Sequence, residues 1–230
     1  MIEFLSSSSF FALALALVVY AFADVLQKKF KTPLLNPLVV SSAVIILLLV
    51  VLDIPNERFQ AGCQVLSYLL TPATICLAIS FYEKFQALKH YLPAVIAGVL
   101  AGVVCSLGSV YILCKVCHVD HTVMLSLMPK SVTTAIGMAL SAELGGITAI
   151  STVAIVITGN IGNMAGPTLC KLLHIDDEIS RGVAFGTASH VIGTSKAIEL
   201  SQLTGAVSSL SLTLAGIVTC LLMSFLAQYM

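Results

Sequence analysis

Long apolar runs separated by charged residues, glycines and prolines dominate the hydrophobic pattern of this chain. The runs lie at residues 8–27, 34–52, 62–82, 92–114, 123–142, 147–173, 180–200 and 205–229. A helix that crosses the hydrocarbon core of a bilayer needs about 20 mostly apolar residues, and most of the runs have that length. The pattern therefore predicts an all-α integral membrane protein with about seven or eight membrane segments.

The apolar segments fall into two classes. Those at 34–52, 92–114 and 205–229 are nearly continuous hydrophobic runs, whereas three others contain helix-breaking residues: Pro72, Pro129, and the glycines Gly186 and Gly193. A break in mid-membrane frees backbone N–H and C=O groups, which lipid cannot satisfy, so such backbone lines a cavity or is buried in protein. We therefore expect broken or re-entrant helices at the centre of the fold, with these four residues as backbone hinges.

Composition agrees with a membrane protein. Of the 230 residues, 58% are hydrophobic and 10% are charged, and the formal net charge is zero. Soluble domains contain about a quarter charged residues, and a nucleic-acid-binding surface is strongly basic, so neither class fits. The N-terminal run lacks the basic n-region and small-residue cleavage site of a signal peptide, so we interpret it as the first membrane helix.

An internal repeat is suggested by hydropathy. Adding about 114 residues moves the span at 34–52 onto 148–166 and the span at 92–114 onto 206–228, and many transporters consist of two such halves. We accordingly describe residues 1–230 as one transmembrane domain, with residues 1–116 and 117–230 as candidate repeats. Lysine positions between the spans leave the number of true crossings open and allow one interrupted segment to be re-entrant.

Polar residues that could bind a substrate concentrate in two of the interrupted segments. A helix that begins in mid-membrane directs its N-terminal N–H groups into the cavity, and this arrangement suits a carboxylate. Hydroxyl groups near such an end can donate to an anion or cap the helix. The predicted substrate-binding residues are Lys130, Ser131, Thr133, Thr134, Thr187, Ser189, His190 and Thr194.

Several of these positions have two interpretations. Lys130 either neutralises a substrate carboxylate or extends to the membrane interface. His190 either binds substrate and carries a proton or is a packed histidine bonded to a neighbouring carbonyl. Lys196 and Glu199 share a helix face and form either an internal ion pair or an exposed helix end. For Asn160 and Asn163 we favour helix packing, because Gly162-x-x-x-Gly166 is a close-approach pattern.

Signatures of enzymes and cofactor sites are absent from the sequence. There is no G-x-S-x-G, H-E-x-x-H or P-loop motif, so we predict a protein that is not an enzyme and has no cofactor or metal site. Residues Cys114 to His118 have the C-x-x-C-H form of haem attachment, but we interpret them as a helix end that carries two thiols. The seven cysteines lie mostly in apolar runs and do not indicate a disulfide framework.

The sequence MPKSVTTAIGMALSAELGGI, followed by ISRGVAFGTASHVIGTSKAIEL, closely resembles the LrgB/CidB family, which includes the membrane domain of the plastid glycolate/glycerate translocator. KTPLLNPLVVS resembles the family's PLLNPL element, so the resemblance covers nearly the whole chain. Ala135 departs from the family pattern, where proline follows PKSVTT. Lys196 stands where the family usually has arginine, so a bidentate role there is in doubt.

The resemblance implies two functions. The first is secondary transport of small monocarboxylates (glycolate, glycerate, pyruvate or lactate), bound between the PKSVTT and GTASH segments. The alternative is a holin-like or antiholin-like modulator of murein hydrolase activity, export and autolysis. The resemblance also implies a small LrgA/CidA-type membrane partner. We expect a homo-oligomer in a bacterial cytoplasmic membrane, and the clustered polarity favours transport.

Overall fold

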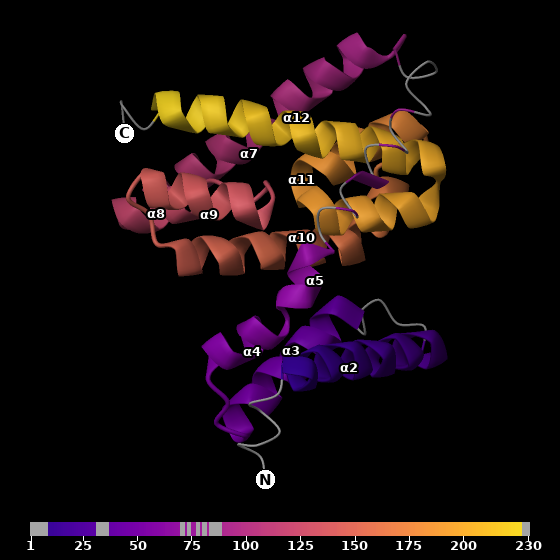
Figure 1. Ribbon diagram of the computed structural model, residues 1–230. Helices are drawn as coiled ribbons and strands as arrows, with labels where there is room; N and C mark the ends of the chain where they lie inside the picture. The colour runs from indigo at the N-terminus through magenta and orange to yellow at the C-terminus, as the bar shows by residue number, and fades with distance from the viewer. Residues whose placement is uncertain are drawn as a thin grey trace. The chain divides into compact units, whose positions relative to one another are not determined.

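The computed structural model describes residues 9–30, 37–69, 72, 75–76, 79, 82 and 89–226. These residues form ten α-helices (Figure 1). Four of the helices are long and apolar enough to cross a membrane: Phe10–Phe30, Leu92–Val116, Thr148–Leu172 and Gln202–Leu226. The prediction of an all-α membrane protein is thereby confirmed, and the full set of seven or eight segments stays a prediction.

The chain divides into two compact units, and the first comprises Met1–Cys76. It contains α2 (Ser9–Phe30), α3 (Pro37–Val51), α4 (Asn56–Gly62) and α5 (Gln64–Tyr68). On α2 the buried residues are Ala12, Val19 and Ala23, whose spacing of seven and four places them on one helix face. Helix α2 packs against α3 and α4. Most of the remaining surface of α2 is apolar and exposed, as in lipid-facing helices, and its last turns carry the ion pair between Lys28 and Asp24.

The predicted span at 62–82 falls at the end of this unit. Residues 62–69 complete α4 and form α5, but Thr71 and Ala73, on either side of Pro72, lie outside the described residues. The hinge at Pro72 therefore stays a prediction, as does the 114-residue repeat.

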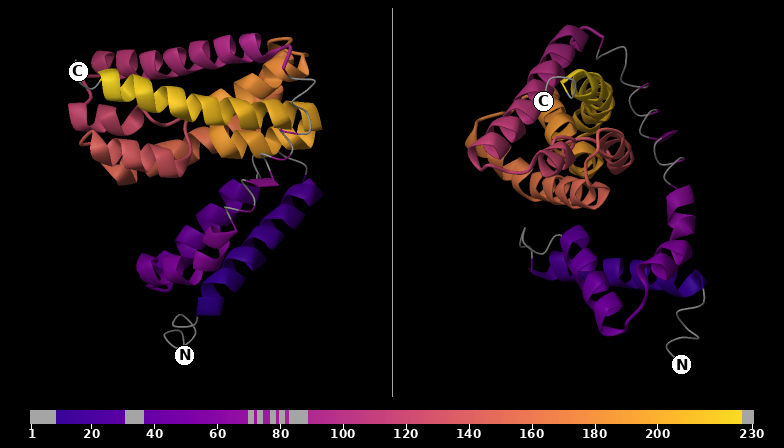
Figure 2. Two further views of the ribbon diagram at one scale, coloured as in Figure 1. Left: turned by 45° about the horizontal axis from the view of Figure 1, so that its top comes forward. Right: turned by 90° about the vertical axis from the view of Figure 1, so that its left-hand side faces the viewer.

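The second unit, Leu77–Met230, contains the remaining described helices. They are α7 (Leu92–Val116), α8 (His121–Leu127), α9 (Thr134–Glu143), α10 (Thr148–Leu172), α11 (Glu178–Leu200) and α12 (Gln202–Leu226). Helices α7, α10 and α12 are long. Helices α8 and α9 lie beside one end of them, and α11 lies toward the other end (Figures 1 and 2).

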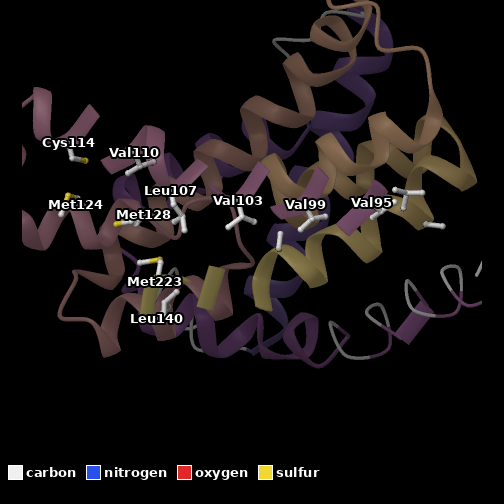
Figure 3. Packing of buried hydrophobic residues seen from close by; sticks show 13 residues of the cluster. Val95, Val99, Val103, Leu107, Val110, Cys114, Met124, Met128, Leu140 and Met223 are labelled. Carbon is white, nitrogen blue, oxygen red and sulfur yellow. The ribbon is translucent and has the colours of Figure 1, made fainter. Parts of the chain in front are cut away.

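One face of α7 forms the apolar core of the second unit. The buried residues of this face recur every three or four positions: Val95, Val99, Val103, Leu107, Val110 and Cys114 (Figure 3). They pack against α12, which contributes Val207 and Met223, and against Met124, Met128 and Leu140. Burying one such side chain contributes about 1.5–3 kcal/mol in a water-soluble core. In a membrane, where lipid is equally apolar, van der Waals contact and close packing carry the association.

Close packing is most pronounced between α11 and α12, because glycines on α11 let the two backbones approach. A Cβ atom added at Gly182 would lie 2.8 Å from the Thr204 carbonyl oxygen, and one added at Gly186 would collide with the Ser208 carbonyl oxygen. The two glycines, four residues apart on one face of α11, thus permit this close helix contact.

Candidate functional site

The predicted span at 123–142 is not one helix. Helix α8 ends at Leu127 and α9 begins at Thr134, so residues 128–133 are non-helical. Pro129 has no backbone N–H, and Thr133 caps the next helix: its Oγ1 accepts from the Ile136 N–H at 3.5 Å. The connection therefore carries Lys130 and Ser131 between two short helices.

Lys130 contacts two serine hydroxyls. Its Nζ donates to Ser131 Oγ at 3.0 Å and to Ser106 Oγ of α7 at 3.3 Å, and the two hydroxyls are 3.1 Å apart. None of the ion pairs found among the described residues involves Lys130. A half-buried ammonium group that has hydroxyl neighbours but no described carboxylate can accept an anionic ligand. We call Lys130, Ser106 and Ser131 the ammonium–hydroxyl cluster.

A pocket adjoins this cluster. Residues from α7, from the 128–133 connection, from α11 and from α12 line it: Val103, Ser106, Leu107, Met128, Ser131, Val132, Thr187 and Thr219. The lining side chains leave no room for a water molecule, so the pocket is closed in this conformation. Four of the eight lining residues carry hydroxyls, and they come from four different parts of the unit.

The second interruption lies inside α11, at His190. The backbone there has φ 42° and ψ −138°, which is non-helical and disfavoured for a residue with a side chain. The imidazole is 2% exposed, and its Nε2 lies 2.9 Å from the carbonyl oxygen of Ile155 on α10. Gly159 makes room for the ring, because a Cβ there would lie 2.6 Å from Cε1. This geometry matches the interpretation of His190 as a packed histidine bonded to a carbonyl.

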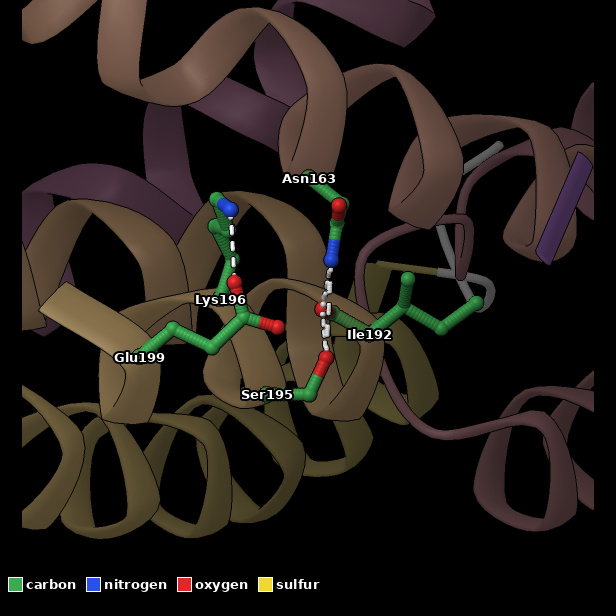
Figure 4. Close-up of polar contacts among 5 residues, drawn as sticks. All are labelled: Asn163, Ile192, Ser195, Lys196 and Glu199. Atoms are coloured by element: carbon green, nitrogen blue, oxygen red, sulfur yellow. Dashed lines mark hydrogen bonds and ion pairs between the residues drawn. The ribbon is translucent and has the colours of Figure 1, made fainter. Parts of the chain in front are cut away.

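Helix α10 also forms hydrogen bonds with residues of α11 that follow His190. Asn163 Nδ2 donates to the Ile192 carbonyl oxygen at 3.0 Å and lies 3.4 Å from Ser195 Oγ, reaching from α10 to α11 (Figure 4). Gly162 faces Ser189 so closely that an added Cβ would overlap its Oγ. Asn163 is thus a helix-packing residue, as the sequence favoured. Lys196 Nζ lies 2.6 Å from Glu199 Oε2, and their side chains are 30% and 64% exposed.

The structure separates the predicted substrate-binding residues into two groups. Ser131 and Thr187 line the pocket, with Lys130 bonded to Ser131, whereas Thr133 and Thr134 begin α9. Thr194 donates to the His190 carbonyl and lies 2.8 Å from Ser208 Oγ of α12. His190 and Thr194 are therefore hydrogen-bonded to α10 and α12, and Ser189 packs against Gly162 of α10. Gly193 approaches the Phe185 carbonyl oxygen, to which an added Cβ would lie 2.9 Å.

Two pocket residues were missed by the sequence analysis. Ser106 lies on α7 and Thr219 on α12, both within spans that read as continuous apolar runs. The only sequence signal for Ser106 is its place in the stretch Gly102–Ser109, where small and hydroxyl-bearing residues interrupt the valines and leucines. Hydroxyls can bond to their own helix in a membrane, so their presence alone does not identify a site.

Aspartates cap the N-termini of α8 and α11, the helices that lead into the two interruptions. Asp120 Oδ2 accepts from the Thr122 N–H at 2.9 Å, and Asp177 Oδ2 accepts from the Ser180 N–H at 2.8 Å. Hydrogen bonds from Ser180 hold the pKa of the exposed Asp177 carboxyl below its usual value. The C-x-x-C-H motif forms the end of α7, with Cys114 buried and Cys117 exposed. The described residues contain no group of three metal-ligating side chains.

Comparison with known proteins places the chain among bacterial membrane proteins. The model of the LrgB-like family matches residues 16–229. The protein named "Uncharacterized protein YwbG" of Bacillus subtilis is 37% identical over 95% of this chain and 97% of its own length. Proteins named "Holin-like protein CidB" are 33% identical in Staphylococcus epidermidis and 32% in Staphylococcus aureus, over 92% of this chain and 93% of theirs. No solved structure matches the chain.

Proposed function

The chain belongs to the LrgB-like family, and it is a multi-pass protein of a bacterial membrane. From that premise we propose that it is a holin-like membrane protein that modulates murein hydrolase activity and export, and thereby autolysis. The observation that carries this proposal is the similarity to the Holin-like protein CidB of two staphylococci, which extends over 92% of the chain. Four helices able to span a bilayer support it, because holin-like action takes place in the membrane.

Changes in cell lysis test this proposal. The gene is deleted, or induced from a plasmid, in its bacterial host, and two quantities are measured: the rate of detergent-stimulated lysis and the murein hydrolase activity of the culture supernatant. We expect both to change in opposite directions on deletion and on induction. Unchanged lysis and hydrolase activity in both strains, with the protein detected in the membrane, would contradict a holin-like function.

A second candidate function is secondary transport of small monocarboxylates such as glycolate, glycerate, pyruvate or lactate. The observation that favours it is the ammonium–hydroxyl cluster at a pocket enclosed by four parts of the second unit. A carboxylate takes one charged and several neutral hydrogen bonds, and Lys130, Ser106 and Ser131 are able to supply them. Thr187 Oγ1 donates to the Val183 carbonyl oxygen at 2.6 Å in this conformation, so its hydroxyl would have to turn toward the ligand. The ten-residue helix α9, which begins at Thr134, adds the positive end of its dipole near these residues.

Transport requires that the closed pocket opens to each side of the membrane in turn. Since the hydroxyls of Ser106 and Ser131 now contact Lys130, a carboxylate entering the pocket would take over contacts to the ammonium group. The binding site would thus be stabilised by ligand in a conformation different from the closed one. Movement of the interrupted helices relative to α7 and α12 is the rearrangement that this mechanism needs.

Uptake into proteoliposomes tests the second function. Labelled glycolate, glycerate, lactate and pyruvate are offered with and without a pH gradient to liposomes that contain the wild type, Lys130→Ala or Lys196→Ala. Lys196 is the matched control, because it is a lysine of the same unit paired with Glu199 outside the pocket. We expect saturable uptake that Lys130→Ala abolishes and Lys196→Ala preserves. Leakage of a neutral dye without saturable uptake would refute the carrier and favour the holin-like function alone.

Partners form part of the proposal. The family is associated with LrgA/CidA-type small membrane proteins, and we propose such a partner for this chain together with self-association. Apolar side chains such as Phe10, Phe22 and Val50 are exposed on the first unit and lie against lipid or another protein in the membrane. Co-purification of the tagged chain with a co-expressed LrgA/CidA-type protein, and with an untagged copy of itself, measures both associations. Recovery of the tagged chain alone would contradict them.

A further inference from the structure

Helices α7 and α10 have matching lengths and matching ends. Each contains 25 residues, and adding 56 to the residue numbers of α7, Leu92–Val116, gives those of α10, Thr148–Leu172. The sequence at the end of α7, LCKVCHVD from Leu113 to Asp120, corresponds to LCKLLHID from Leu169 to Asp176. The two stretches share leucine, cysteine, lysine, histidine and aspartate at equivalent positions.

The turns that follow the two helices have the same conformation. His118 has φ 52° and His174 has φ 54°, both in the left-handed region that few residues with side chains adopt. After each histidine the chain forms the same hydrogen bond, since Val119 N–H donates to the Cys114 carbonyl and Ile175 N–H to the Cys170 carbonyl, both at 2.8 Å. A left-handed turn is a common helix ending, and Asp53 forms one after α3 as well. What indicates a structural repeat is that the two histidine turns coincide with the matching sequence and the matching helix ends.

The correspondence continues through the interruptions. The same shift of 56 places Pro129–Thr134 on Phe185–His190, and downstream it aligns Ile-Gly at 136–137 with Ile-Gly at 192–193 and Glu-Leu at 143–144 with Glu-Leu at 199–200. At both interruptions the aligned glycine lies close to the backbone carbonyl of the residue eight positions earlier in the chain. A Cβ at Gly137 would lie 3.3 Å from the Pro129 carbonyl oxygen, and one at Gly193 2.9 Å from that of Phe185. In a straight helix these atoms would be about two turns apart.

The two repeats are antiparallel to each other. Helices α7 and α10 run in opposite directions, with α8 and α9 at the end where α7 finishes and α11 at the other end (Figures 1 and 2). Each long helix packs against the interrupted segment of the other repeat: α7 against α11, and α10 against α8 and α9. Helix α10 in addition packs against α11 of its own repeat. Gly102 of α7, for example, would place a Cβ 3.2 Å from Thr187 Oγ1.

We propose that residues 92–144 and 148–200 are two inverted copies of one unit, whose interrupted segments enter the membrane from opposite faces and contribute equivalent hydroxyls to one binding site for a small monovalent anion. The equivalent hydroxyls are Ser131 and Thr187, which correspond under the shift of 56 and line the same pocket. Two related segments that meet at one pocket are the arrangement in which both sides of the membrane can reach the same ligand. The nature of the ligand rests on the second proposed function.

The copies differ at the residue before each hydroxyl, where Lys130 corresponds to Gly186. Helix α12 explains the difference. Its backbone contacts Gly186 at the Ser208 carbonyl oxygen and at the Leu212 nitrogen, which a Cβ would approach to 3.0 Å, so no side chain fits there. Lys130 instead extends toward Ser106. The site therefore holds one positive charge, and a monovalent anion balances it.

Labelling from the two sides of the membrane tests the inversion without reference to any ligand. Cys117 and position 173 are equivalent residues at the ends of α7 and α10, and both are exposed. One variant keeps Cys117 as its only cysteine, and the other has all native cysteines replaced and carries Leu173→Cys. A membrane-impermeant maleimide is applied to intact and to permeabilised cells. We expect one variant to react in intact cells and the other only after permeabilisation; reaction of both from the same face would overturn the inverted repeat.

Binding of glycolate by the purified protein tests the shared site. The melting temperature in detergent is followed as glycolate replaces gluconate at constant sodium concentration, for the wild type, Ser131→Ala, Thr187→Val and the control Ser109→Ala. Ser109 is an exposed hydroxyl of α7 outside the pocket. Hydrogen bonds to charged groups are strong, so we expect each pocket variant to weaken binding about tenfold or more and the control to bind as the wild type does.

The exchange variant Ser131→Thr/Thr187→Ser provides a check that uses the equivalence itself. It keeps both hydroxyls and the total number of methyl groups, so we expect a glycolate affinity within about threefold of the wild type. The single variants Ser131→Ala and Thr187→Val each lose a hydroxyl and are expected to bind glycolate more weakly. Wild-type affinity in Ser131→Ala or Thr187→Val, with an unchanged melting temperature before ligand is added, would overturn the shared site. Failure of vesicle uptake would refute transport while leaving both of these results intact.

Discussion

The two interruptions of the second unit are held in different ways. At residues 128–133 the chain leaves the helix over several positions, and a charged side chain bonds to hydroxyls beside a pocket. In α11 the chain leaves it at the single residue His190, whose ring bonds to α10, while glycines pack the flanking turns against α10 and α12. The comparison shows that the charged residue of the first interruption lies beside the candidate ligand site, whereas His190, which breaks the second helix, is bonded to α10 and only Thr187 of that segment lines the pocket.

Ligand affinity should separate the two interruptions most strongly. Lys130→Gln is expected to raise the glycolate concentration for half-maximal uptake at least 100-fold, because it removes the only charge in the cluster and leaves polar groups of similar size. His190→Gly is expected to change that concentration by less than about threefold, because the ring does not line the pocket. Uptake at varied glycolate concentration measures both variants. A large loss of affinity in His190→Gly would show that the imidazole ring, too, takes part in ligand binding.

Tight packing around the second interruption predicts the next largest effect. Gly162→Ala would overlap Ser189 Oγ and must push α10 away from α11, so we expect a loss of about 3 kcal/mol in free energy of unfolding. At the first interruption Gly137→Ala meets mainly the terminal methyl of Ile155, which can rotate, so its loss should be smaller. Gly108→Ala, with nothing nearby, is the control and should be neutral or gain up to about 1 kcal/mol. Reversible denaturation in detergent measures all three; equal losses would contradict the packing difference.

Backbone strain predicts opposite glycine effects at two equivalent positions. At His190, glycine tolerates the non-helical φ of 42°, so His190→Gly should be more stable than His190→Ala by about 1–2 kcal/mol. At Thr134, the first residue of α9, the order should reverse by up to about 1 kcal/mol, because glycine is a poor helix residue. Denaturation of the four variants gives both differences. If alanine were the better residue at both positions, the chain would not have this conformation at His190.

The smallest effect concerns the cap that starts α11. Because hydrogen bonds lower the pKa of Asp177 in the folded state, its carboxylate stabilises the fold above the pKa of the unfolded chain, and this stabilisation is lost as pH falls through the folded-state pKa. Asp177→Asn keeps a capping side chain but removes the charge, so it should cost about 0.5 kcal/mol at pH 7 and nothing at low pH. Melting temperatures measured from pH 7 to pH 3 test this. A cost that persists at the lowest pH would mean that the charge does not contribute.

Much of the architecture could be predicted from hydropathy. The predicted segments at 92–114 and 147–173 correspond to α7 and α10 within a few residues, because a helix in lipid satisfies its own backbone and needs only length and apolarity. Pro129 likewise marked the separation of α8 from α9, since proline cannot donate the helical hydrogen bond. The sequence placed Lys130 and Ser131 in the same interrupted segment, and the structure shows the two side chains in contact, while their binding of a substrate stays a prediction.

The pocket was less predictable. Ser106 and Thr219 lie in spans whose hydrophobicity hardly varies around the helix, so periodicity did not show which face turns inward. His190 is compatible in sequence with either ligand binding or packing, and its contact with the carbonyl of Ile155, 35 residues earlier in the chain, could not be predicted from neighbouring residues. The 56-residue correspondence is difficult to recognise in the sequence alone, because most of its identical residues are scattered, whereas the two histidine turns have the same backbone conformation.

The sequence by itself determined that this is an all-helical membrane protein, where its long helices lie, and to which family it belongs. Those properties depend on local rules, because membrane insertion and helix breaking act on neighbouring residues. Only the tertiary structure decided that Lys130, Ser106, Ser131 and Thr187 meet, and that His190 is bound to α10. Such contacts depend on how distant helices pack, and small residues at positions such as Gly102, Gly162 and Gly186 set that packing by permitting close approach.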